Sequence, residues 1–261
     1  MIQFSLNRFG KLAKWSLTND RKYYVKSFLQ VFVIMLLGFL FFPTTIKSYD
    51  HMGGYHACCI MIVIMLLVTV VLGPSFMYYS MENKHDMQNL LMLPASNFEK
   101  YLMRYASWIF LIPLYLVAFF GADLLQYVVH WILGHDYVVF VSTTLANRIS
   151  DTWREMPDSL RYTAVNTIII LAIWFHPLYA LGATFFRSRK FNWVLTTIVI
   201  VLLTIVQMWI FPFEEHTSYK ETTTTSIVFG YVFAVCWAIL SFWLSYKLFC
   251  RTQVIGRFVN L

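Results

Sequence analysis

Six long stretches of mostly apolar residues alternate with shorter polar segments along the 261 residues of the chain. An α-helix rises about 1.5 Å per residue, so roughly 20 apolar residues are needed to cross about 30 Å of hydrocarbon. All six stretches reach this length. The pattern predicts an all-α integral membrane protein that forms a single transmembrane domain over residues 1–261. Its six transmembrane helices are expected near residues 27–46, 57–79, 101–123, 163–186, 192–212 and 226–249.

Residues 1–20 follow a different, amphipathic pattern. Apolar residues from Ile2 to Leu17 recur on one face of a helical wheel, and Lys11 and Lys14 lie on the opposite face. A helix that is apolar on one side and cationic on the other lies in the membrane interface. We therefore expect an N-terminal interfacial helix that ends near Asp20. The alternative is a basic tail without fixed structure.

The segment between the second and third apolar stretches, residues 81–105, has the sequence MENKHDMQNLLMLPASNFEKYLMRY. Its first part places polar residues on one side of a helix and leucines on the other. Pro94 ends this helix, because proline lacks an N–H and disfavours helical geometry in the residue before it. Ser96 and Glu99 then have the spacing of a capping box, which starts the next helix. The pattern predicts a short helix across the ends of two spans, with a loop that merely caps two helices as the alternative.

The polar stretch after the third span carries a further helical pattern. We expect the third helix to start at Asn97, to pass Asp123 and then to bend into an outer segment. Within residues 134–161, apolar residues recur at near-helical spacing beside charged ones, which is typical of a helix on the membrane surface. Pro157 and Asp158 mark the turn before the fourth span.

Composition and charge agree with a membrane protein and add its orientation. Mean hydropathy is +0.62, and 59% of the residues are hydrophobic. Of the 20 lysines and arginines, 15 fall in the terminal segments and in the two loops on the same side of the predicted membrane. Basic residues are enriched in cytoplasmic loops, so both termini are expected to be cytoplasmic. The net charge of +7 is then a topology signal that favours contact with membrane lipids and not with nucleic acid.

Motifs for catalysis or cofactor binding are missing from the sequence. It contains no G-x-x-x-x-G-K-[ST], H-E-x-x-H, G-x-S-x-G or G-x-G-x-x-G pattern. We therefore expect neither an enzyme nor a chain that binds ATP or a metal itself. Asp123, His130, His135 and Asp136 have the residue types of a zinc site, but the two histidines are five residues apart, which does not place them on one helical face.

Polar residues inside predicted spans are candidates for function, because burying them in a membrane is costly. His176 lies near the middle of the fourth span, directly before Pro177, which frees a backbone carbonyl. His176 could satisfy that carbonyl, line an intramembrane cavity, or serve as a metal or proton site. Asn166 and Gln207 could line the same cavity, although interhelical hydrogen bonds are the expected role for both.

Three segments also resemble a known family: LLMLPASNFEKYLMRY at 90–105, FHPLYALGATFFRSRKFNW at 175–193 and SYKLFCRTQVIGRF at 245–258. Together with the interfacial helix, the six spans and the short helix between spans two and three, they resemble the permease subunits of ABC type-2 transporters, in particular a bacterial branch. The resemblance covers essentially the whole chain. One departure is that residues 212–225 are too few for the re-entrant hairpin of relatives that export large glycans or lipids.

The resemblance implies a permease of the bacterial cytoplasmic (inner) membrane that exports an unidentified substrate. Its partners would be a cytoplasmic ABC ATPase subunit, which would hold ATP and Mg, and a second copy or a homologous permease. The short helix would be the coupling helix that docks on the ATPase, through Glu82, Asn83, Lys84, His85, Asp86, Met87, Asn89, Leu90, Leu91 and Leu93.

Two other functions remain open. The chain could be a non-transporting membrane scaffold or sensor, or an intramembrane enzyme that uses His176. Proton-coupled transport would need buried carboxylates or an inverted repeat, and the sequence offers few such features.

Overall fold

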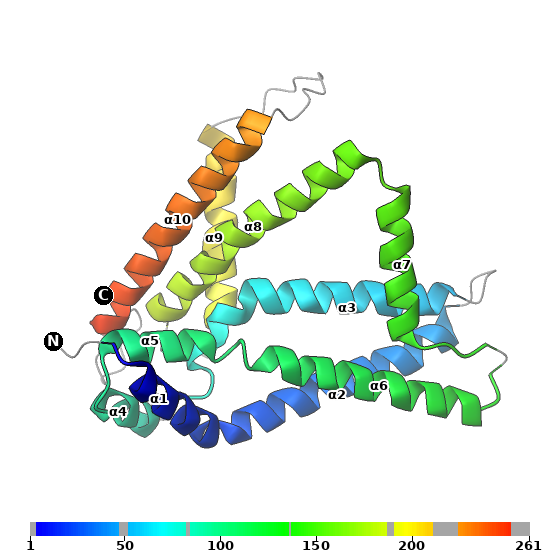
Figure 1. Cartoon of the computed structure of the whole chain (residues 1–261), viewed down its shortest axis with the longest axis horizontal. Coiled ribbons are helices and arrows are strands. Elements are labelled where there is room, and N and C mark those ends of the chain that lie inside the picture. Colours follow the sequence, from blue (N-terminus) through cyan, green and yellow to red (C-terminus); the bar gives the residue numbers. More distant parts are fainter. Residues whose placement is uncertain are drawn as a thin grey trace. The chain divides into compact units, whose positions relative to one another are not determined.

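A computed structural model describes residues 4–46, 52–81, 84–135, 137–186, 191–210 and 224–251. These residues are mostly helical and contain no strand (Figure 1). The helices are α1 (Leu6–Asn19), α2 (Arg21–Thr45), α3 (Gly53–Leu72), the 3₁₀ helix η1 (Gly73–Tyr78), α4 (Lys84–Met92), α5 (Asn97–Ala106), α6 (Leu111–Ile132), α7 (Val141–Glu155), α8 (Asp158–Phe185), α9 (Asn192–Ile210) and α10 (Thr224–Cys250).

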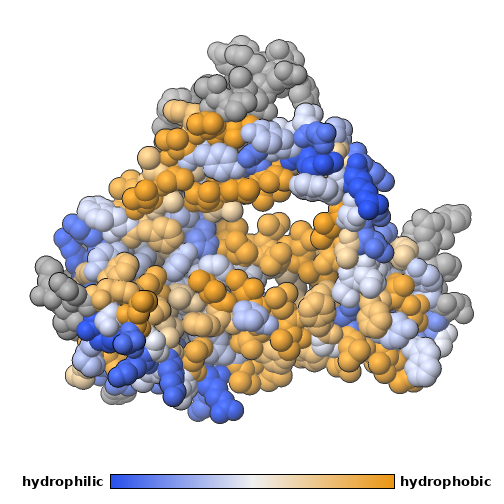
Figure 2. Space-filling view, viewed as in Figure 1, coloured by the Kyte–Doolittle hydropathy of each residue, from blue (hydrophilic) through white to orange (hydrophobic). Residues whose placement is uncertain are grey.

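Among the described residues, five helical segments are long and apolar enough to cross a membrane, as expected of a multi-pass membrane protein. They are Arg21–Thr45, Gly53–Tyr78, Asn97–Ile132, Asp158–Phe185 and Ile227–Cys250. Many of their large apolar side chains are exposed, and Figure 2 shows hydrophobic residues on the outside of the long helices. Lipid would cover such faces in a bilayer. Within α9, the stretch Asn192–Val206 is apolar but shorter than these five segments. Six spans therefore remain a prediction.

The third span differs from the expectation of one helix that bends after Asp123. A turn at residues 107–110 divides it into α5 and α6, and α6 continues to Ile132. Pro113 lies in the first turn of α6, where proline is tolerated best, and this favours a helix start near Leu111. The segment Asn97–Ile132 has 36 residues, more than one crossing needs. The 22 residues of α6 alone suffice for one crossing, so the start of α5, which carries Glu99, lies beyond the residues that a crossing needs.

The described chain divides into two compact units. The first unit comprises Met1–Ser16, Val70–Ser107 and Tyr162–Leu261, and the second comprises Leu17–Thr69 and Trp108–Arg161.

In the second unit, α2 packs along α6, and α3 and α7 complete an apolar core. The close approach of α3 to α2 requires Gly54, because a Cβ there would lie 2.4 Å from the Cα of Pro43. α7 occupies the stretch in which a surface helix was expected. The core consists of Met35, Phe39, Tyr55, Cys58, Cys59, Phe119, Ala122 and Val141.

In the first unit, η1, α4, α5, α8 and α10 surround a second core. Leu90 of α4 and Tyr101 of α5 are buried in it beside Phe249 of α10. Trp15 of α1 packs against the same core. This unit contains α4 and α5, which correspond to the short amphipathic helix expected before Pro94 and to the helix expected after the capping box.

Candidate functional site

The candidate functional site is the short helix α4 together with α5, the helix that holds it. Ser96 is the N-cap of α5, and both hydrogen bonds of the predicted capping box are present. The Glu99 N–H donates to Ser96 Oγ (3.2 Å), and the Ser96 N–H donates to Glu99 Oε2 (2.7 Å). Five of the ten residues of α5 are buried, and three of these, Glu99, Lys100 and Arg104, are charged. Buried charges need partners, and each of these three contacts a different segment.

Glu99 joins α5 to α1. Its fully buried carboxylate accepts hydrogen bonds from the Ser5 N–H (2.8 Å) and from Arg8 Nε (2.8 Å) and Nη2 (2.7 Å). Such a two-nitrogen contact is the strong geometry for an arginine and a carboxylate. The Arg8 guanidinium, helped by the N–H groups of Ser5 and Ser96, lowers the pKa of Glu99 to about 2 although burial opposes this. The same hydrogen bond raises the pKa of Arg8.

Lys100 holds the C-terminal end of α4. Its Nζ donates to the Leu91 carbonyl at 2.7 Å. The last carbonyls of a helix have no helical donor and carry partial negative charge, so a cation there both satisfies and stabilises them. Leu90 beside it is fully buried, whereas Asn89 is exposed and Met92 is 82% exposed. α4 therefore has a fixed inner face and an available outer face.

Arg104 holds the chain just before α4. Its buried guanidinium donates from Nη1 to Ser80 Oγ at 3.0 Å and lies 6.0 Å from the ring centroid of Trp15. Ser80 belongs to the turn between η1 and α4. α5 thus holds the C-terminal end of α4 through Lys100 and the turn that precedes α4 through Arg104.

Two tyrosines join α5 to the long helices of the same unit. Tyr101 donates to Ser245 Oγ of α10 at 3.0 Å, and Ser245 Oγ in turn donates to the Ala180 carbonyl of α8 at 3.1 Å. Tyr105 Oη lies 2.6 Å from Nε2 of His176, also in α8. α5 is consequently the helix through which α1, α4, α8 and α10 are connected by polar contacts.

His176 satisfies a carbonyl, but on another helix than the one anticipated. Its Nδ1 lies 2.6 Å from the carbonyl oxygen of Val70 in α3. Val70 is four residues before Pro74, whose missing N–H leaves that carbonyl without its helical donor. A carbonyl only accepts, so Nδ1 carries the proton, and in the neutral ring Nε2 accepts from Tyr105. Both ring nitrogens of His176 are engaged in these contacts. His176 therefore satisfies a backbone carbonyl, as in the first of the three roles considered for it.

A second side chain contacts the same break in the segment Gly53–Tyr78. Asn192, at the start of α9, is almost fully buried and donates from Nδ2 to the Ser75 carbonyl at 2.9 Å. Gly73 and Pro74 begin η1, where the α-helix changes to 3₁₀ geometry. Short 3₁₀ stretches within long helices often mark hinges. This break, held by His176 and Asn192, leads directly to the turn before α4.

Asn166, proposed for the same intramembrane cavity, is not brought together with His176. Asn166 forms an interhelical hydrogen bond, since its Oδ1 accepts from Tyr231 of α10 at 2.7 Å. It lies ten residues before His176 in α8, which is about 15 Å along a helix. The side chain of Gln207 is outside the described residues.

The structure describes only some of the residues predicted to dock on an ATPase. Lys84 to Leu91 lie in α4, and Leu93 follows it, while Glu82 and Asn83 are outside the described residues. The side chains of Lys84, His85 and Met87 are also outside the described part of the structure. Asp86 and Leu91 are half-buried.

The outer residues considered for zinc have other partners where they are described. Asp123 accepts from the N–H groups of Val141 (2.7 Å) and Ser142 (3.0 Å), and His130 Nδ1 lies 3.1 Å from Gln126 Oε1. The carboxylate thus caps α7. In the described ranges no three metal-ligating side chains come together, and Asp136 lies outside them.

Comparison of the chain with protein-family models, with curated proteins and with solved structures found no match.

Sequence reasoning recognised Glu99 as a capping residue but missed its pairing with Arg8. It also missed Lys100, Arg104 and Pro74. Signals for them were present: charged residues at the start of an apolar span need partners, and the rule applied to Pro177 applies equally to Pro74.

Proposed function

We propose that this chain is the membrane-spanning permease subunit of an ABC type-2 exporter, with six spans and both termini in the cytoplasm of a bacterium. A separate ATPase would bind ATP and Mg and dock on the exposed side of α4. A second copy or a homologous permease would complete the transport path. The chain itself would perform no bond chemistry.

The observation that carries this proposal is that α5 holds both the C-terminal end of α4 and the turn that precedes α4. A docking helix must transmit displacement, which it can do only if it does not slide on its support. Lys100 fixes the end of α4 at Leu91, Arg104 fixes the turn at Ser80, and Leu90 is buried beneath. A push on the exposed side would therefore be passed to α5 and η1, and through them to the third and second spans. Closure of two ATPases would in this way tilt the path from inward-facing to outward-facing.

Copurification tests the proposal. The chain is expressed with the ATPase encoded beside it and solubilised gently, and the bound ATPase and its hydrolysis rate are measured. We expect the double variant Asn89→Arg with Met92→Arg to lose most of the bound ATPase, because both side chains lie on the exposed side of α4. Charge reversal at Glu82 and Asp86 is expected to uncouple hydrolysis from transport.

Asn147→Arg is the matched control, since Asn147 is an exposed asparagine on α7 of the second unit. It should retain the ATPase. If no ATPase copurifies with the unaltered chain, or if the α4 variants retain coupled hydrolysis, the permease proposal is wrong. The former result would favour a non-transporting scaffold or sensor.

A further inference from the structure

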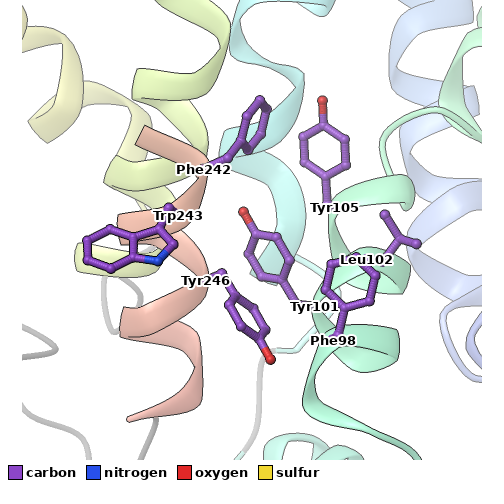
Figure 3. Close-up of a pocket in the computed structure, with 7 residues that line it drawn as sticks. All are labelled: Phe98, Tyr101, Leu102, Tyr105, Phe242, Trp243 and Tyr246. Atoms are coloured by element: carbon purple, nitrogen blue, oxygen red, sulfur yellow. The ribbon is translucent and has the colours of Figure 1, made fainter. Parts of the chain in front are cut away.

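An aromatic groove runs between α5 and α10 in the first unit. Its volume is about 420 Å³. In Figure 3, Phe242 and Tyr246 of α10 face Tyr101 and Tyr105 of α5. The floor is closed by ring contacts, with centroids 5.6 Å apart for Tyr101 and Tyr246 and 5.3 Å apart for Tyr105 and Phe242.

The walls of this groove remain open to the surroundings. Phe98 of α5 is 48% exposed and Trp243 of α10 is 51% exposed. The lining is aromatic and aliphatic, so it offers dispersion and apolar contact and few hydrogen bonds. Hydrocarbon is the chemistry that fits it.

Cations stand at one end of the groove. The Lys247 ammonium lies 4.4 Å from the ring centroid of Trp243, and Arg251 follows one turn later, just after the end of α10. Both side chains are exposed. The segment of α10 that is long and apolar enough to cross a membrane ends at Cys250, and long cationic side chains near such an end extend to the lipid headgroups. Phe242 is nine residues before Arg251, about 14 Å deeper along the helix.

We propose that this groove binds an anionic glycerophospholipid. One acyl chain lies between Phe98 and Trp243 on the floor formed by Tyr101 and Tyr246, and the phosphate lies between Lys247 and Arg251. An apolar groove that leads from two cations into the hydrocarbon layer matches the order of groups in such a lipid. The inference is independent of transport and of which leaflet faces the cytoplasm.

A helix of a second copy is a poorer occupant. A helix with its side chains is about 10–12 Å across, whereas a groove of 420 Å³ has the size of a small-ligand site. A second copy of this basic chain would also bring positive charge to Lys247 and Arg251, whereas an anionic headgroup complements them.

Quenching of Trp243 by brominated lipids tests the proposal. The full chain is placed in phosphatidylcholine nanodiscs that contain equal fractions of brominated phosphatidylglycerol or brominated phosphatidylcholine. The signal of Trp243 is the difference between each protein and its Trp243→Phe counterpart. We expect stronger quenching by phosphatidylglycerol. In the double variant Lys247→Gln with Arg251→Gln, this preference should fall roughly fivefold per cation, with quenching by phosphatidylcholine retained.

Two controls accompany this experiment. Arg154→Gln removes an exposed cation from α7 and should leave the preference unchanged. Trp209 on α9, isolated by the same difference with Trp209→Phe, should be quenched equally by both lipids. Equal quenching of Trp243 by the two lipids, or a preference that survives loss of both cations, would overturn the proposal. So would absence of quenching by either lipid, because Trp243 would then be covered by protein.

Discussion

Each unit contains a buried carboxylate that caps a helix, but only in the first unit does the carboxylate also bind a cation. Asp123 accepts backbone hydrogen bonds at the start of α7, and no ion pair of Asp123 is found in the described part of the chain. Glu99 caps its own helix and pairs with Arg8, 91 positions earlier. The first carboxylate fixes one local helix end, whereas the second joins two distant segments. The consequences of removing them should differ accordingly.

The largest effect is expected from Asp123→Ala. Val141 is fully buried, so its N–H would lose its acceptor without gaining water. An unsatisfied buried donor costs about 1–3 kcal/mol of folding free energy. We expect a lower melting temperature of the purified protein and faster hydrogen exchange throughout α7, with exchange in α1 unchanged.

Asp151→Ala is the control for that variant, because Asp151 is an exposed carboxylate on α7 itself. It should change stability by less than about 0.5 kcal/mol. If hydrogen exchange in α7 is unaltered in Asp123→Ala, the cap contributes nothing to stability. The conclusion that Asp123 fixes the start of α7 is then wrong.

Glu99→Gln should release α1 and leave the rest of the first unit folded. Glutamine keeps an acceptor for the cap at Ser96 but loses the charge that binds Arg8. A spin label at Lys11→Cys, on the exposed side of α1 in a background without native cysteines, would report greater mobility. Arg8→Gln should have the same effect, and combining both variants should add little, since either one removes the pair. Additive effects would show that Arg8 and Glu99 act separately.

Acid should reproduce the Glu99 variant in the unaltered sequence. The pKa of Glu99 is about 2, below the ordinary value of 4.5. A lowered pKa means that this carboxylate contributes its full stabilisation above about pH 4.5 and loses it as the pH falls towards 2. The mobility of the label at position 11 should rise across that window and not above it. In Glu99→Gln it should already be high and independent of pH, which separates this group from other carboxylates.

These contrasts also show what the sequence could predict. Apolar length predicted the all-α membrane character, because hydropathy over 20 residues is a local quantity. The capping box of Ser96 and Glu99 was predictable for the same reason, since its partners are three residues apart. The pairing of Glu99 with Arg8 was not, because nothing local links position 8 to position 99. The break at residues 107–110 was not predictable from Pro113 alone, because proline favours a helix start but Pro177 lies inside α8 without ending it.

His176 is an intermediate case. The residue type and the principle were right, because a proline frees a carbonyl that a polar side chain must satisfy. The proline was the wrong one: Pro177 is adjacent in sequence, but the contact runs to the carbonyl freed by Pro74. Periodicity within α8 could not reveal which carbonyl of another helix His176 would meet.

The smallest expected effect tests this assignment most directly. Interhelical hydrogen bonds in membranes contribute about 0.6 kcal/mol on average and up to about 1.7 kcal/mol, so His176→Ala should destabilise the protein by this amount. Pro74→Ala gives position 74 an N–H that can reach the Val70 carbonyl, and the histidine should then matter less. The double variant should therefore be more stable than the sum of the two single changes predicts, in thermal unfolding of the reconstituted protein. Pro177→Ala with His176→Ala is the matched control, and its effects should add. The opposite result is that the free-energy changes of Pro74→Ala and His176→Ala add, whereas those of Pro177→Ala and His176→Ala do not. His176 would then satisfy the carbonyl freed by Pro177, and the connection between α8 and the break before α4 must be abandoned.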